Sequence, residues 1–194
     1  MNLFSRLRRL WIINYLGLLI VSACTPTSSQ GLLFTSKEGN FSILMPGAIL
    51  EETNSPVKGI TSRNWSSIKK ESIYTVADVK LPKKIAPDRL QKFLQLLINA
   101  AIKTNFIKGK KISQTAVNKN GYKCQDFSLT GKPSSYIIGE AKKKGLTIKS
   151  KLFYQRSLLC IKDNHAIEAV VFTPSPEELK TNGASFIKSF NLKS

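Results

Sequence analysis

The chain has 194 residues, of which 30 are lysine or arginine and 12 are aspartate or glutamate, so its formal net charge at pH 7 is +18. It contains one histidine and three cysteines, without a CxxC or HxxxH pair. Nucleophilic triads and zinc sites draw on these residue types at defined spacings. The composition therefore argues against both classes, and we expect no metal ion and no cofactor.

The first 24 residues have the three parts of a secretory signal. Arginines stand at positions 6, 8 and 9, an apolar run covers residues 10–21, and two small residues precede Cys24. A helix that stays in the membrane needs about 20 apolar residues, whereas this run is shorter and contains Asn14. The segment is therefore expected to be a cleaved export signal rather than a permanent span.

The end of this segment, Val21-Ser22-Ala23-Cys24, resembles the bacterial lipobox, in which the cysteine is acylated. The resemblance implies an exported bacterial lipoprotein that loses residues 1–23 and is held by membrane lipid through Cys24. The alternative is cleavage by ordinary signal peptidase, which accepts the same small residues and would leave a soluble periplasmic protein. Residues 24–31 are small and polar, as in a tether, and lead to a single domain expected over residues 32–194.

The positive charge favours an acidic partner. The lysines are spread along the chain rather than gathered in one stripe with aromatic residues, and an exported protein would rarely meet a chromosome, so nucleic acid is not an expected partner. Anionic lipid headgroups, or an acidic surface of a membrane protein complex, fit the charge better. The alternative is that the lysines form an ordinary solvated surface.

Two β-hairpins are predicted at the start of the domain. Residues 32–36 and 41–45 are short β-type runs on either side of a Glu-Gly-Asn turn. Residues 57–69 and 73–81 form a second pair of β-type runs. The intervening Glu51-Glu52 pair is assigned to a loop.

The clearest helix is predicted over residues 87–105. Pro87 suits the first helical position and Asp88 the positive end of the helix dipole. Leucine, phenylalanine and isoleucine then recur at helical spacing, with glutamine and lysine opposite. Such an amphipathic helix can lie on a membrane, but packing against a sheet is the favoured interpretation.

The remainder of the domain predicts further strands and a closing helix. Ser175 as N-cap, Pro176 at the first position and Glu178 at the third begin a helix over residues 176–190. The expected fold class is α+β, a mostly antiparallel sheet packed by a central helix and a C-terminal helix. The strands expected between the two helices cover residues 111–118, 122–130, 146–162 and 166–173.

Cys124 and Cys160 are a candidate disulfide. Both lie in β-type segments of an expected exported domain, where cysteines tend to pair. If the two segments are neighbours in the sheet, the two side chains can face each other. The alternative is a pair of buried free thiols.

No residue is assigned a catalytic role. The single histidine, His165, is expected to be a solvated turn residue, and the Glu51-Glu52 and Glu177-Glu178 pairs are assigned to a loop and a helix cap. Trp65 is a candidate contact for a partner, since tryptophan often anchors interfaces. The alternative interpretation, an edge of the core, is favoured for it.

Several short motifs carry a resemblance to a known family. They are F-x-S-x-E-G-x-F at residues 34–41 followed by M-P-G at 45–47, Y-x-V at 74–76 followed by Pro82, and S-F-x-x-S-F at 185–190. These motifs, and the order of elements over residues 34–192, resemble small exported cyanobacterial proteins and the PsbP-like superfamily. That superfamily includes the extrinsic P subunit of photosystem II and the DcrB-type lipoproteins.

The resemblance implies an antiparallel sheet sandwiched by helices and a non-enzymatic accessory or assembly role at a membrane. Its motifs are packing and turn positions, so it carries over no binding residue. The sequence therefore predicts a membrane-anchored binding or accessory module. A periplasmic carrier of a small ligand is the second hypothesis, and a hydrolase with a carboxylate pair is the third. A ligand pocket larger than about 300 Å³ between the central helix and the sheet would favour the carrier.

Overall fold

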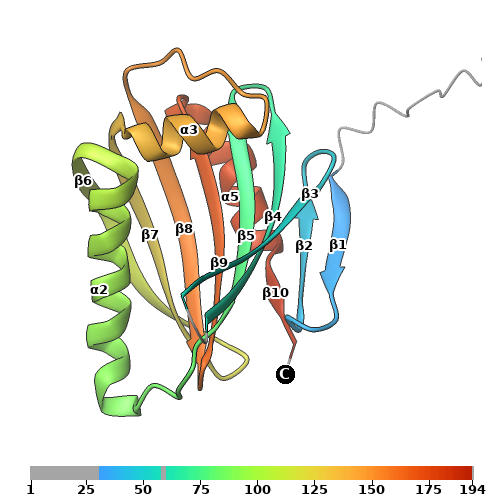
Figure 1. Ribbon diagram of the computed structural model, residues 1–194, viewed down its shortest axis with the longest axis vertical. Helices are drawn as coiled ribbons and strands as arrows, with labels where there is room; N and C mark the ends of the chain where they lie inside the picture. Colours follow the sequence, from blue (N-terminus) through green and yellow to red (C-terminus); the bar gives the residue numbers. More distant parts are fainter. Residues whose placement is uncertain (1–30, 58–59, 194) are drawn as a thin grey trace, which may run out of the picture.

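The computed structural model describes residues 31–57 and 60–193. The predicted signal, its cleavage and the acylation of Cys24 lie outside these residues. Figure 1 shows a large curved sheet with one long helix along its left side, a short helix across its upper end and a small separate sheet on the right. Among the described helices, none combines the length and hydropathy needed to cross a bilayer.

The large sheet has seven strands, and every neighbouring pair is antiparallel. In spatial order its strands are β3 (Leu50–Val57), β4 (Ile60–Lys69), β5 (Ser72–Lys80), β9 (His165–Thr173), β8 (Phe153–Lys162), β7 (Tyr122–Pro133) and β6 (Phe106–Lys119). Strand β9 is thus placed between β5 and β8, and it joins the early part of the chain to the later hairpins.

The small sheet has three strands in the order β1 (Leu32–Ser36), β2 (Phe41–Met45) and β10 (Asn191–Leu192). The first two form the predicted hairpin, and both neighbouring pairs are antiparallel. Because β10 follows the last helix, the small sheet brings the two ends of the described chain together (Figure 1).

The long helix α2 (Pro87–Asn105) has the bounds predicted from the sequence. Pro87 needs no amide partner at the first turn, and Asp88 is the acidic residue of that turn. Leu94 and Ile98, one turn apart, are 1 % and 0 % exposed against the sheet. Burial of each stabilises the fold by about 1.5–3 kcal/mol, which fixes the helix over β6 and β7.

Each face of the large sheet has its own hydrophobic core. On the face under α2, which we call the α2 face, Phe127, Leu129, Phe153 and Phe172 of the sheet pack with Leu94 and Ile98 of the helix. The opposite face carries Trp65, Tyr74, Leu158, Ile167 and Val171 and packs against the small sheet and the C-terminal helices. The buried members of both cores fall within residues 41–192, so the described segment holds both cores by itself.

The fold class is the predicted one, an α+β arrangement with a mostly antiparallel sheet. Both predicted hairpins are present, and the second runs from β4 to β5. Strand β3 was not predicted, and the assignment of Glu51-Glu52 to a loop is wrong because both residues pair with β4. The strand expected over residues 146–162 begins only at Phe153.

The helices also differ from the prediction in two places. Helix α3 (Ser135–Lys143) was not predicted, although Ser134 caps it by accepting a hydrogen bond from the amide of Ile137. The closing helix is unbroken over residues 176–189, within the predicted 176–190, but its middle turn is not α-helical. It consists of α4 (Pro176–Glu178), the π-helix η1 (Leu179–Gly183) and α5 (Ala184–Ser189). Its predicted start is correct, because the Ser175 hydroxyl accepts from the amide of Glu178.

Candidate functional site

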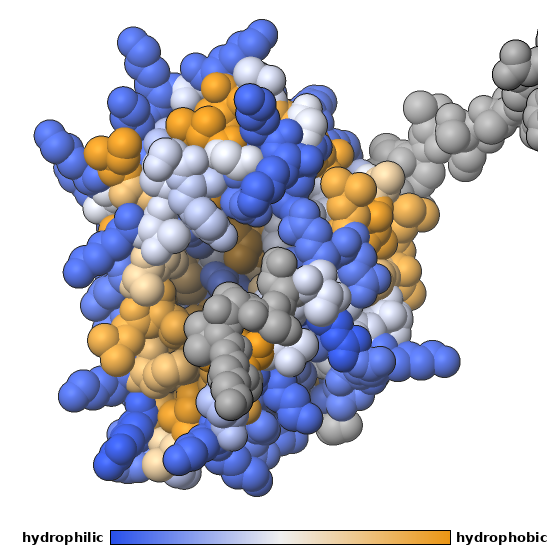
Figure 2. All heavy atoms as spheres, in the orientation of Figure 1, coloured by the Kyte–Doolittle hydropathy of each residue, from blue (hydrophilic) through white to orange (hydrophobic). Residues whose placement is uncertain are grey.

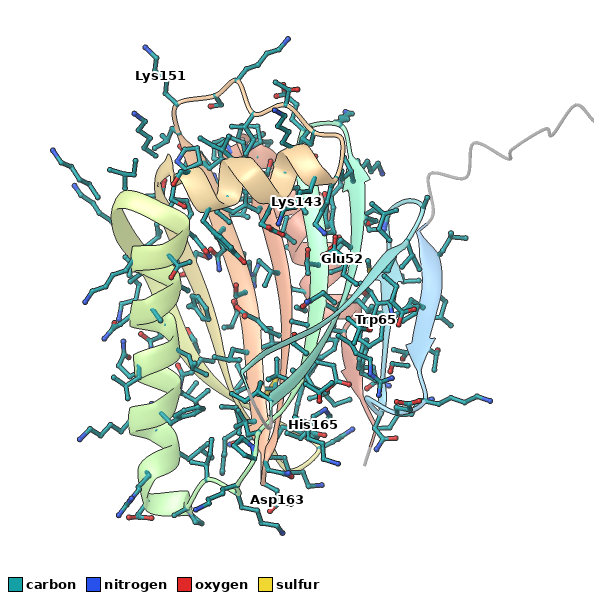
Figure 3. The ribbon with its side chains drawn as sticks, viewed as in Figure 1. Glu52, Trp65, Lys143, Lys151, Asp163 and His165 are labelled. Carbon is teal, nitrogen blue, oxygen red and sulfur yellow. A yellow bond between two sulfur atoms is a disulfide. The ribbon has the colours of Figure 1, made fainter. Side chains whose placement is uncertain are left out.

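His165 is held by two side chains rather than free in a turn, so the interpretation of it as a solvated turn residue is wrong. It is the first residue of β9. Its Nε2 lies 2.5 Å from Oδ1 of Asp78 on β5, and its Nδ1 lies 3.1 Å from the hydroxyl of Tyr122 on β7. The imidazole therefore links three strands at the lower end of the sheet (Figure 3).

An open cleft of about 380 Å³ lies beside His165 and includes Asp78, Glu38 and Arg63. Arg63 is paired with Glu38, whose hydrogen bond raises the pKa of the guanidinium. Burial, followed by the charges of Asp78 and Asp163, raises the pKa of the Tyr122 phenol. Each carboxylate in this cleft has a basic partner and the phenol stays protonated at neutral pH, so the cluster fits a structural tie better than a catalytic centre.

The two glutamate pairs do not converge in one cleft. Glu52 accepts a hydrogen bond from the ammonium of Lys144 at 2.8 Å, and this ion pair links β3 to the end of α3. Glu178 accepts from the hydroxyl of Tyr74 at 2.6 Å and from Asn182. Burial would raise the pKa of Glu178, but the hydrogen bonds from Tyr74 and Asn182 outweigh it and lower that pKa. Both carboxylates thus hold elements of the fold together.

The space between α2 and the sheet is largely filled. A hollow of about 180 Å³ remains there, lined mainly by apolar side chains that include Phe93, Leu97 and Ala101 of the helix. A second hollow of about 240 Å³ lies on the same face beneath α3, bounded by the Glu52–Lys144 pair. Pockets for small ligands usually enclose about 300–1,000 Å³, so neither hollow reaches that range.

Glu168 lines the hollow beneath α2, and every other residue that lines this hollow is apolar. The register sets Leu159 and Ala77 on either side of it. Burial raises the pKa of its carboxyl group, and the nearby hydroxyl of Ser157 opposes this by hydrogen bonding to the charged form. The sheet therefore carries a carboxylate that is more costly to ionise in the folded protein than in the unfolded chain.

Replacing this residue, Glu168→Gln, should make unfolding less sensitive to pH. A carboxyl whose pKa is raised on folding stabilises the protein fully below its unfolded pKa of about 4.3, and this contribution is lost as the pH rises through the folded pKa. The variant should therefore gain stability relative to the native chain as pH rises from 4 to 8. Urea unfolding at several pH values measures this, with the exposed Glu177→Gln as control. Parallel pH profiles for the native chain and Glu168→Gln would contradict it.

A basic cleft lies where β6 begins and β7 ends. It is a wide, shallow hollow of about 640 Å³, open to solvent, and is lined by Lys108, Lys110, Lys132, Lys151, Ile107 and Leu152, together with residues that carry no charge. We call it the lysine cleft. None of the ion pairs within residues 31–57 and 60–193 involves any of its four lysines. Figure 3 shows Lys151 on the loop at the upper end of the molecule.

The structure places the remaining predicted residues as follows. It joins Cys124 of β7 to Cys160 of β8 by a disulfide, and the strand register sets the two residues directly opposite each other. Trp65 is 3 % exposed and its ring packs 5.2 Å from Phe34 and 5.6 Å from Phe41. The partner-contact interpretation of Trp65 is therefore wrong, because its side chain is inside the core (Figure 3).

The apolar side chains that remain exposed lie elsewhere. Leu33 and Leu44 are 69 % and 45 % exposed on the β1–β2 hairpin, and Ile107 and Leu152 are 49 % and 46 % exposed at the lysine cleft. Figure 2 shows apolar surface along α2 and over β1 and β2, with hydrophilic surface between them. The lysine cleft could not be found from the sequence, because its residues come from three separate segments.

Comparison with known proteins finds chains that are similar to this one in structure but none that is similar in sequence. The sequence matches no protein-family model and no curated protein. Cyanobacterial PsbP (CyanoP) from Synechocystis sp. PCC 6803, solved in solution, has a TM-score of 0.50 and 10 % identity, over 89 % of this chain and 98 % of its own.

Two further solved structures are similar to a smaller degree. The putative regulator PA94 from Pseudomonas aeruginosa, a protein of unknown function, has a TM-score of 0.46 and 8 % identity, covering 81 % of this chain and 92 % of its own. The Ran-binding protein Mog1p from Saccharomyces cerevisiae has a TM-score of 0.47 and 6 % identity, covering 84 % and 95 %. The likeness to the cyanobacterial protein shows that this chain has a PsbP-like fold.

Proposed function

We propose that this protein is a bacterial lipoprotein that acts as a non-enzymatic binding or accessory module, exported and held at a membrane through acylated Cys24. Its partner on this proposal is a membrane protein complex, which the domain contacts at the surface of the membrane that holds its anchor. The seven residues 25–31 that follow Cys24 reach at most about 25 Å, so the folded part stays close to the lipid.

The observation that favours a binding module over a carrier is the filled space under α2. The hollow there, about 180 Å³, is smaller than the pocket of about 300 Å³ that a small-ligand carrier would need. The polar cluster around His165 is already satisfied by Asp78 and Tyr122. Recognition through the outer surface therefore fits the geometry better than transport or hydrolysis.

The anchor is supported by the sequence of the first 24 residues and by where the domain begins. The first described strand starts at Leu32, directly after the polar segment that follows Cys24. An acyl chain contributes about 0.8 kcal/mol for each buried CH₂ group, and two or three chains hold a protein on a bilayer stably. A domain that begins within eight residues of such an anchor remains at the membrane surface.

Replacing the predicted anchor, Cys24→Ala, should release the protein from the membrane. The native chain, expressed in a bacterial host, should have an intact mass that corresponds to a start at Cys24 plus acyl chains. An inhibitor of lipoprotein signal peptidase should shift that mass to the uncleaved precursor. The Cys24→Ala chain should carry no acyl mass.

An unmodified native chain that starts at Cys24 would overturn the lipoprotein proposal and leave a soluble periplasmic protein. If the acyl mass is found, crosslinking of the lipidated protein in native membranes then tests the accessory role. A defined membrane protein complex among the products is the expected result.

A further inference from the structure

The lysine cleft has an unusual combination of charge and exposure. Its four lysines come from the start of β6, the end of β7 and the loop before β8, so three segments converge on it. No carboxylate lines it, although the chain carries 12 acidic residues. Among the described lysines outside the cleft, only Lys84, Lys143 and Lys144 form ion pairs, so what distinguishes the cleft is the convergence of four lysines with no carboxylate among them.

Four ammonium groups around one hollow repel one another, and an anion bound among them would offset this repulsion. Their exposed positions keep this repulsion tolerable in water through screening, although no carboxylate of the described residues lies among them. A phosphate group that entered the cleft would meet positive charge from several directions. The geometry thus favours an anion supplied from outside the chain.

Apolar side chains at the same place narrow the choice of anion. Ile107 and Leu152 are about half exposed, and both line the cleft among the lysines. A soluble anion would make no use of them, whereas a lipid surface offers headgroup phosphates and acyl chains side by side. Lysines that surround exposed apolar residues are typical of surfaces that bind anionic membranes.

The place where the chain enters the domain lies at the same end of the molecule as the lysine cleft. The chain enters the domain at the start of β1, in the upper half of Figure 1, and the loop that carries Lys151 forms the upper end (Figures 1 and 3). We propose that the lysine cleft docks on anionic phospholipid headgroups, with Ile107 and Leu152 entering the interface, so that the upper end of the domain faces the bilayer. This inference extends the membrane-anchored function proposed above by naming the surface that meets the lipid.

The test uses a chain that cannot be acylated, residues 25–194, which retains both cores. Its binding to vesicles of phosphatidylcholine alone is compared with binding to vesicles that also contain phosphatidylglycerol, by sedimentation at low and at high salt. The cleft variant carries Lys108→Gln, Lys110→Gln, Lys132→Gln and Lys151→Gln. The control variant loses the same charge from exposed lysines outside the cleft, through Lys37→Gln, Lys83→Gln, Lys92→Gln and Lys123→Gln.

The native chain should bind the anionic vesicles and lose that binding at high salt. The cleft variant should bind them at least about tenfold more weakly, and the control variant less than about threefold more weakly, because each lysine at the surface contributes on the order of 1 kcal/mol. A thermal unfolding midpoint close to that of the native chain shows that each variant is folded. An additional Leu152→Ser change should weaken binding to the anionic vesicles further at low salt, because it removes an exposed apolar side chain beside the lysines.

Equal losses in the two lysine variants would overturn the proposal, because they would show a response to net charge alone. Equal binding of the native chain to neutral and anionic vesicles would overturn it as well. Neither result bears on the anchor, because this chain lacks Cys24. The mass of the full-length protein decides that question separately, so failure of the lysine cleft and failure of the lipoprotein proposal are distinguishable.

Discussion

A chain in which Cys124 and Cys160 are both replaced by alanine should be about 3–4 kcal/mol less stable than the native protein. The disulfide closes a loop across a sequence separation of 36, and in the chain-entropy account the loss scales with the logarithm of that length. The alanines retain part of the apolar contact, since both cysteines are buried in the core. Urea unfolding at neutral pH measures the difference.

Two controls isolate the covalent bond from the packing. The native protein measured in a strong reductant should lose most of the same free energy, while the double variant should be indifferent to the reductant. The single replacement Cys124→Ala leaves a free thiol at Cys160 and no disulfide, so the reductant should change the stability of this variant little. Identical unfolding midpoints for the native and doubly replaced chains would show that the bond does not stabilise the fold.

Replacement of Phe41 by alanine should cost about 3–5 kcal/mol, the range for removal of a fully buried phenylalanine. Phe41 is 0 % exposed on β2. Its ring lies 5.6 Å from that of Trp65 on the large sheet and 5.7 Å from that of Phe190 at the end of α5. Because Phe41 joins the small sheet to the large one, the cavity would lie between them and could not close without moving a whole sheet.

The matched control for this change lies on the same strand. Leu44 of β2 is 45 % exposed, and Leu44→Ala should change the free energy of unfolding by less than about 1 kcal/mol. Both variants are compared by denaturant unfolding, with tryptophan fluorescence as the probe because Trp65 contacts Phe41. Similar losses for the two variants would mean that the small sheet is not joined to the large one through this aromatic cluster.

The elements predicted well are those whose signals are local. Helix α2 has a proline, an acidic first turn and apolar residues at helical spacing, and its bounds follow from these features alone. The β1–β2 hairpin is similarly defined by a turn between two alternating runs. Ser175 at the start of α4 carries a complete capping pattern within four residues.

The elements that were missed depend on contacts far away in the sequence. Strand β3 contains two glutamates, an asparagine and a proline, and it is a strand because it can pair with β4 at the edge of the sheet. Strand β10 is two residues long and exists only because β2 is beside it. Helix α3 does have a local signal, Ser134 as N-cap, but Gly139 in its interior weakens it.

The candidate site shows the same division between local and distant information. His165 and Asp78 are 87 residues apart, and only the register of β5 against β9 brings them together. The sequence indicates that the chain is basic, whereas the convergence of four lysines on one cleft depends on where β6, β7 and the loop before β8 meet. The sequence thus gives the chemical types of the side chains, whereas the pairing of the strands decides which of them lie together.

The position of β9 has a consequence for the order in which the molecule can form. Strands β3–β5 and β6–β8 are each neighbours in the sheet in chain order, although α3 lies between β7 and β8. Within the large sheet the two sets are joined only through β9, which is the last of its strands in the chain. A chain that emerges with its N-terminus first therefore holds two separate half-sheets until residues 165–173 are free. Such late, long-range pairing slows folding. Truncation before His165 would leave the edges of β5 and β8 open to pairing with other chains, a common start of aggregation.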